Sequence, residues 1–160
     1  MEQQDAEIIV EAIIADLTDR GGLQNEWEAI EQEATEQLRL QLVGIVMRED
    51  DPDVATEAMI SDLSAQEGLD HVFGDMEAEM LDSMRQTWKA IFKKREEIAQ
   101  AVREQLDGKI AEARPMLDEH DPEFTGIANE TDLRRFAINM ALIGVQGEIL
   151  REDLEDKEEV

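Results

Sequence analysis

Two stretches of this chain decide its fold, because the second repeats the pattern of the first 46 positions later. Residues 11–48 read EAIIADLTDRGGLQNEWEAIEQEATEQLRLQLVGIVMR, and residues 57–94 read EAMISDLSAQEGLDHVFGDMEAEMLDSMRQTWKAIFKK. Aligned without a gap, the stretches share residues at Glu11/Glu57, Ala12/Ala58, Ile14/Ile60, Asp16/Asp62, Leu17/Leu63, Gly22/Gly68, Leu23/Leu69, Glu33/Glu79, Arg39/Arg85 and Ile45/Ile91. Each copy predicts a short helix, a Gly-Leu turn and a long helix, and such a hairpin needs a neighbour to cover its apolar face.

Apolar residues recur at steps of three and four through each copy, which is the spacing of one helix face. In the first copy this spacing predicts helices over residues 5–19 and 25–48, separated by Gly21 and Gly22. In the second copy it predicts helices over 53–65 and 70–107, separated by Gly68. We expect the long helix to bend near 93–97, where charges crowd both faces. Asp51 or Asp53 is expected to cap the helix that has Pro52 in its first turn.

The rest of the chain shows no clear third copy. Pro115 and the polar run 118–123 predict a loop, and Asn129 or Thr131 is expected to cap a last helix that reaches Ile149. No window alternates with a period of two for long enough to predict a strand.

These patterns together predict an all-α fold and one domain over residues 1–160. We expect five to six helices, arranged as two tandem short-helix/Gly-Leu turn/long-helix hairpins, about residues 5–50 and 51–96. Helices from about 97 to 155 are expected to form a C-terminal cap on the two hairpins.

The chain is strongly acidic: 41 Asp and Glu residues against 15 Lys and Arg give a formal net charge of −26 over 160 residues. Nucleic acids and anionic membranes are polyanions, so this charge opposes direct binding to either. Apolar residues make up 42% of the chain, which argues against wholesale disorder. Without cysteine, disulfides and thiolate ligands are excluded.

Signals for secretion or membrane insertion are not found in the sequence. The first five residues are acidic rather than basic, and the longest uncharged stretch, Phe136 to Gly147, has twelve residues against roughly 20 needed to cross a bilayer. We expect a soluble protein, in the cytoplasm or in a particle assembled there.

Candidate chemistry is sparse. Neither His71 nor His120 lies in a recognisable catalytic motif, and no His-Glu-x-x-His pattern, Gly-rich phosphate loop or Walker lysine occurs. Paired carboxylates are too common here to indicate acid–base catalysis. We therefore expect a protein that is not an enzyme, with no catalytic, cofactor-binding or metal-binding residues and no cofactor.

One loop, residues 121–132, resembles a calcium-binding EF-hand loop in the positions of its oxygen ligands and in Gly126 at the sharp turn. Against that interpretation, Ala128 stands where an apolar Ile is expected, and the last ligand is Asp132 rather than the longer Glu. The alternative is a polar connector in which Asn129 and Thr131 cap the next helix.

Positive charge is concentrated in residues 85–95. With two aromatic residues this segment forms the predicted partner-binding site: Arg85, Trp88, Lys89, Phe92, Lys93, Lys94 and Arg95. One interpretation is a docking site for an acidic segment, for example from another copy of this protein. The other is internal, in which the segment neutralises an adjacent acidic helix such as residues 26–36.

Three functional hypotheses fit these patterns. The first is an adaptor or assembly protein that binds other proteins and forms a homo-oligomer or larger assembly, which suits a viral or mobile-element accessory protein or virion component. The second is a DNA mimic, in which carboxylates replace phosphates and occupy a nucleic-acid-binding protein. The third is adaptation of a helical protein to high salt, with a hydrated carboxylate surface.

Overall fold

The computed structural model describes residues 1–20, 23–119 and 127–158, and every regular element in these ranges is a helix. The prediction of an all-α chain is therefore confirmed for the described part of the protein. It contains eight helices, more than the five to six expected: α1 (Gln3–Asp19), α2 (Gln24–Glu28), α3 (Gln32–Arg48), α4 (Pro52–Ser64), α5 (Asp70–Asp75), α6 (Ala78–Lys93), α7 (Arg95–Glu119) and α9 (Glu130–Glu158).

The number of helices is higher because each predicted long helix is broken near its start. A glutamate with extended backbone precedes the longer piece in both cases: Glu31 has φ −58° and ψ 141°, and Glu77 has φ −64° and ψ 145°. The change of direction lets the preceding apolar side chains, Ile30 and Met76, pack against the core. Burial of this apolar surface stabilises the break, because a straight helix would leave more of it in water.

The second long pattern is also divided where a bend was expected. Helix α6 ends at Lys93, Lys94 leaves helical geometry with φ −100° and ψ 16°, and α7 begins at Arg95. The predicted bend near 93–97 is confirmed.

The predicted loop at Pro115 is wrong, because α7 continues through this proline to Glu119. A proline inside a helix removes one backbone hydrogen bond and crowds the preceding turn. Packing offsets this cost, since the next two residues, Met116 and Leu117, contact a small apolar cluster that joins the end of α7 to the start of α9. Residues 120–123 of the expected loop lie outside the described residues.

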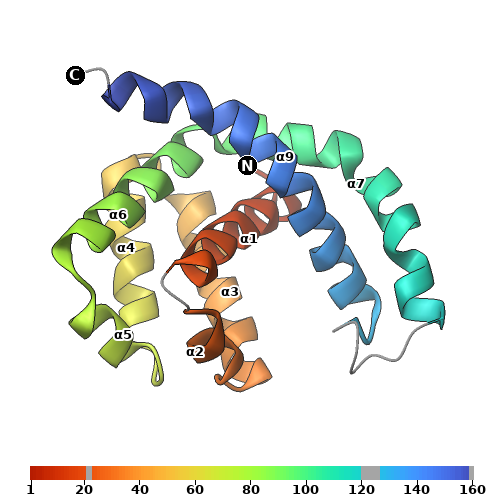
Figure 1. Cartoon of the computed structure of the whole chain (residues 1–160), viewed down its shortest axis with the longest axis horizontal. Helices are drawn as coiled ribbons and strands as arrows, with labels where there is room; N and C mark the ends of the chain where they lie inside the picture. Colours follow the sequence, from red (N-terminus) through yellow and green to blue (C-terminus); the bar gives the residue numbers. More distant parts are fainter. Residues whose placement is uncertain (21–22, 120–126, 159–160) are drawn as a thin grey trace.

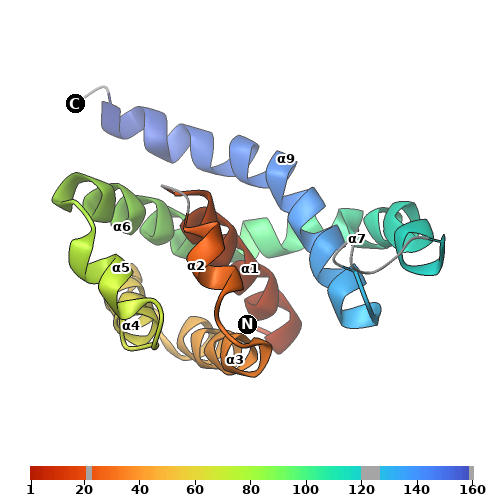
Figure 2. The same cartoon turned by 60° about the horizontal axis from the view of Figure 1, so that its bottom comes forward.

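Helix α1 is the centre of the fold (Figure 1), and it contacts α2, α3, α6, α7 and α9. From Ala6 to Ile14 every residue except Glu7 is buried, which is the pattern of a helix enclosed on most of its circumference. Helix α9 starts beside the end of α7 and then crosses α1 towards α6 (Figure 2). Helices α7 and α9 thus contact α1 of the first hairpin and α6 of the second.

Two predicted helix caps are confirmed. The Asp51 carboxylate accepts the backbone N–H groups of Asp53 at 2.8 Å and Val54 at 3.5 Å, with Pro52 in the first turn of α4. At the start of α9, the Asn129 side chain accepts the backbone N–H of Asp132 at 2.9 Å. Each contact satisfies an amide that has no acceptor within its own helix.

Candidate functional site

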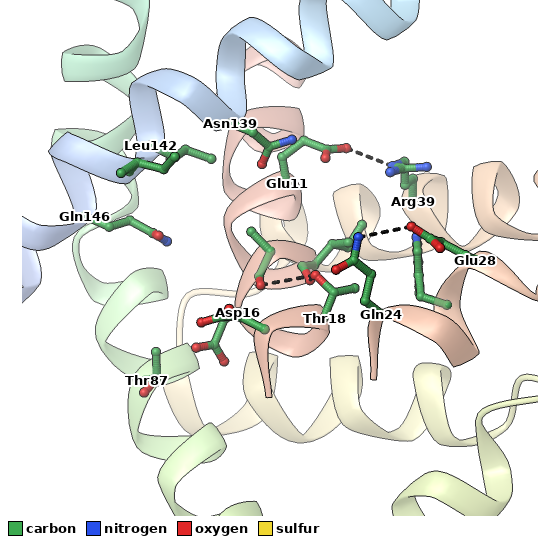
Figure 3. A pocket seen from close by; sticks show the side chains of 15 residues that line it. Glu11, Asp16, Thr18, Gln24, Glu28, Arg39, Thr87, Asn139, Leu142 and Gln146 are labelled. Carbon is green, nitrogen blue, oxygen red and sulfur yellow. Dashed lines mark hydrogen bonds and ion pairs between the residues drawn. The ribbon is translucent and has the colours of Figure 1, made fainter. Parts of the chain in front are cut away.

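An open cleft of about 710 Å³ lies between α1, α2 and α9, and α3 and α6 each contribute one residue to it. Polar side chains of α1 and α2 face those of α9 across the cleft (Figure 3). Its apolar lining consists of Ile14, Ala15, Trp27, Leu142 and Ile143. Ile143 is 80% exposed, the highest value among the large apolar residues that the structure describes.

Four carboxylates and one guanidinium line this cleft. Two of the carboxylates are neutralised within the fold: Arg39 Nε donates to Glu11 Oε1 at 2.8 Å, and Arg20 Nε donates to Asp16 Oδ2 at 2.8 Å. The other two, Asp19 and Glu28, are exposed and form no ion pair in the described part of the chain. The mouth of the cleft is therefore negatively charged.

Asp16 also anchors the largest buried side chain. Trp88 is fully buried between the two hairpins, and its indole Nε1 donates to Asp16 Oδ2 at 2.8 Å. A buried indole N–H without an acceptor would be costly, so this contact couples the core of α6 to the wall of the cleft.

A cluster of four charged side chains holds α9 against the first hairpin: Glu11, Glu36, Arg39 and Arg135, which we call the α9 ion cluster. Both terminal nitrogens of Arg135 donate to the Glu36 carboxylate, and the Nη2–Oε2 distance is 2.6 Å. Arg135 Nε also lies 3.8 Å from Glu11 Oε1. The two hydrogen bonds from Arg135 lower the pKa of the Glu36 carboxyl below its usual value, and they raise the pKa of Arg135.

Three members of this cluster have counterparts 46 positions later in the chain. Arg85 Nε donates to Glu57 Oε1 at 2.7 Å, and Arg85 Nη1 lies 3.6 Å from Asp82. These contacts match those of Arg39 with Glu11 and Glu36. The second set differs in exposure: the Glu57 side chain is 54% exposed, whereas that of Glu11 is 6% exposed.

The two hairpins also differ in the apolar residues beside these ion pairs. Val10, Leu40 and Val43 line a smaller groove with Ile138 and Arg135 of α9. The corresponding residues of the second hairpin are Thr56, Gln86 and Lys89. Helix α9 contacts α1 of the first hairpin and α6 of the second, and the groove that contains Val10 and Val43 lies on the first.

The predicted partner-binding segment, residues 85–95, is distributed between the core and the surface. Trp88 and Phe92 are fully buried, so neither is accessible to a partner of the folded chain. Arg85 and Lys89 form ion pairs with Glu57 and Asp53 of α4, and Lys89 lowers the pKa of the Asp53 carboxyl.

The end of the segment also has internal contacts. Lys94 pairs with Glu97 at 3.7 Å, and Arg95 lies over the Phe92 ring at 4.0 Å. Lys93 is exposed. These contacts agree with the interpretation that the segment neutralises acids of its own chain. The acids belong to α4 and α7, however, and not to residues 26–36.

The first half of the loop that resembled an EF-hand, residues 121–126, lies outside the described residues. Its last ligand position is used for helix capping, because Asp132 Oδ2 accepts the backbone N–H of Ala128 at 3.1 Å. Among the residues that the structure describes, no group of three or more His, Asp or Glu side chains is arranged to hold a metal ion.

The sequence patterns did not predict the cleft or the role of Arg135. Glu11 and Arg39 are each identical in the two copies. Opposite charges that recur at matching positions of both copies are a signal for an ion pair between the two longer helices of each hairpin. Arg135 lies outside both copies, so the repeat carried no signal for it.

Comparison with protein-family models, with curated proteins and with solved structures found no match to this chain. In the described part of the chain, none of the helices has the length and apolar character needed to cross a membrane.

Proposed function

We propose that this chain is a non-enzymatic protein-binding or assembly protein, built from two copies of one helical hairpin and a C-terminal helix that contacts both copies. The helix boundaries support the duplication, because each helix of the second copy ends within one residue of the position that a 46-residue shift predicts. The first copy's helices end at Asp19, Glu28 and Arg48, and the second copy's end at Ser64, Asp75 and Lys93. The matching Glu11–Arg39 and Glu57–Arg85 ion pairs support it as well.

The observation that carries the proposal is the cleft between α1, α2 and α9. It combines an exposed aliphatic side chain, Ile143, with two carboxylates, Asp19 and Glu28, that form no ion pair within the described part of the chain. Apolar surface next to uncompensated charge is what a protein-binding site offers, because the first supplies affinity and the second selects the partner.

The proposed partners are proteins, in the form of another protein or of further copies in an assembly. The net charge of −26 favours a basic partner and disfavours nucleic acid and anionic membranes. Residues 85–95 stay a weaker candidate surface, since Lys93 is exposed while Arg85 and Lys89 are already paired.

Affinity capture from the native source, followed by identification of the bound proteins, tests this function. We expect a defined protein to copurify in stoichiometric amount, or the purified chain to elute as an oligomer in size-exclusion chromatography. A small monomer that captures nothing defined would contradict the proposal.

The same purified protein separates the alternative, DNA mimicry. A mimic would prevent a captured protein from binding DNA in competition, whereas an adaptor would leave its DNA binding intact. Exposed acids occur on each of the eight helices described here, for example Asp19 on α1, Glu104 on α7 and Glu148 on α9, so the acidity by itself favours neither function.

A further inference from the structure

The cleft between α1, α2 and α9 has two properties that together define the chemistry of an occupant. Its apolar side is contributed mainly by Trp27, which is half-buried, and Ile143, which is exposed. Its charged side is contributed by Asp19 and Glu28, which form no ion pair in the described part of the chain. An occupant must therefore present apolar and positive groups on adjacent faces.

The chain itself shows how such an occupant binds to this fold. Helix α9 docks on the first hairpin with Arg135 on the acids and with Ile138 and Leu142 buried, three and seven positions later. This is the i, i+3, i+7 spacing by which an amphipathic helix lies in a groove. The cleft is bounded by α1, α2 and α9, and side chains of a further helix would meet ridges and grooves of the same kind there.

Another copy of this chain is a poor source of the positive charge. The basic residues Arg85, Lys89 and Lys94 are paired with acids of their own chain. Two copies would also bring together two net charges of −26, and like charges repel at close approach.

We propose that the cleft binds one basic amphipathic helix of a different protein, with aliphatic side chains on Ile143 and Trp27 and Lys or Arg side chains on Asp19 and Glu28. This proposal rests on the protein-binding function above and names the partner's chemistry and its site.

The probe for the test is a fluorescein-labelled peptide of about 18 residues, or five helical turns. It carries Leu at i, i+3 and i+7 with Lys and Arg beside them. A peptide with the same composition, reordered so that no apolar stripe forms, is the control ligand. Binding to the full chain is measured by fluorescence anisotropy at about 0.15 M salt, where long-range attraction is screened within about 8 Å.

Two matched pairs of charge reversals locate the site. The cleft variant is Asp19→Lys with Glu28→Lys, and the control variant is Asp107→Lys with Glu104→Lys on α7. The two pairs are matched in local contacts. Glu28 accepts a hydrogen bond from the side-chain amide of Gln24, and Glu104 accepts one from Gln100, in each case from four residues earlier. We expect the cleft variant to weaken peptide binding at least about tenfold and the control variant no more than about twofold.

A third comparison tests the apolar side of the cleft. Ile143→Ser is expected to weaken binding at least about threefold, while Val54→Ser, at an exposed aliphatic residue of α4 outside the cleft, leaves it unchanged. The Trp27 indole resonance in the NMR spectrum should shift on binding, and the reordered peptide should leave it in place.

The proposal is overturned if both charge-reversal pairs weaken binding equally, if Ile143→Ser has no effect, or if the peptide does not bind. These results are distinct from a failure of the proposed function. A captured native protein that binds the wild type and the cleft variant equally would leave the protein-binding function standing and remove the cleft as its site.

Discussion

Arg135 of α9 donates two parallel hydrogen bonds to Glu36 of α3, although the two residues are 99 positions apart in the chain. Paired contacts between a guanidinium and a carboxylate are directional, so they determine the orientation of a helix as well as its proximity. Beside them, Glu11 is almost completely buried and lies between Arg39 and Arg135. The first hairpin and the cap helix are thus joined by charge as well as by apolar packing.

Replacing Arg135 with Met should lower the free energy of unfolding by about 1–3 kcal/mol, because Glu36 loses both hydrogen bonds from Arg135, and Glu36 and Glu11 keep only Arg39. The measurement is urea unfolding followed by circular dichroism. The neighbouring Arg134→Met is the control, since Arg134 forms no ion pair in the part of the chain described, and it should change stability by less than about 0.5 kcal/mol. Equal effects would mean that the ion cluster does not hold α9.

The same contact predicts a dependence on pH. The folded pKa of Glu36 is lowered, so its contribution to stability is complete above the unfolded value of about 4.3 and is lost as the pH falls through the folded pKa. Acidification also relieves repulsion among the other carboxylates, so the comparison is between the wild type and Glu36→Gln. The difference in their unfolding free energies should shrink steadily as the pH is lowered from about 6 to about 3. A difference that stays constant over this range would contradict the assignment.

The two matching arginines should differ in importance. Arg39→Met removes the partner of a buried carboxylate and should cost about 2–4 kcal/mol. Arg85→Met removes the partner of Glu57, which is exposed, and should cost less than about 1 kcal/mol. Urea or thermal unfolding of the two variants measures both losses of unfolding free energy in the same fold. Equal losses would show that burial of the paired carboxylate does not determine how much stability is lost.

Trp88→Phe should lower the free energy of unfolding by about 1–3 kcal/mol, because it removes buried volume and the indole donor to Asp16. Trp27→Phe, at a half-buried residue of the cleft, should cost less than about 1 kcal/mol. A larger loss for Trp27 would place the centre of the core elsewhere.

Pro115→Ala should stabilise the protein, since the new N–H restores one hydrogen bond within α7 and alanine is the better helix former. We expect a gain of about 1–3 kcal/mol, compared with about 0.5–1 kcal/mol for Gly108→Ala, where an added Cβ meets open space. A loss of stability at Pro115 would indicate that the proline determines the local path of the helix.

Much of the secondary structure follows from local patterns. The three- and four-residue spacing of apolar side chains predicted the helices, and the caps at Asp51 and Asn129 followed from side chains that reach nearby amides. The breaks after Glu28 and Asp75 did not follow, because the apolar spacing runs on through both. They depend on Ile30 and Met76 packing against distant parts of the core.

The candidate site was less accessible to sequence reasoning. Residues 85–95 stood out by charge and aromatic content, but in a helix such residues divide between a buried face and a surface face according to what lies next to them. Trp88 and Phe92 became core, and Arg85 and Lys89 became partners of α4. The cleft joins α1 to α9 across more than 100 positions, and no local pattern connects them.

By itself, the sequence determined an acidic all-α chain with a pattern that recurs after 46 residues, because charge, helical spacing and end signals are local properties. The tertiary structure decided which acidic side chains pair with α9, which contacts α1 of the first hairpin and α6 of the second. Val10 and Val43 are buried where the second hairpin has Thr56 and Lys89, and beside them Arg135 pairs with Glu11 and Glu36. The cleft exists only as a consequence of this docking, because α9 forms one of its walls.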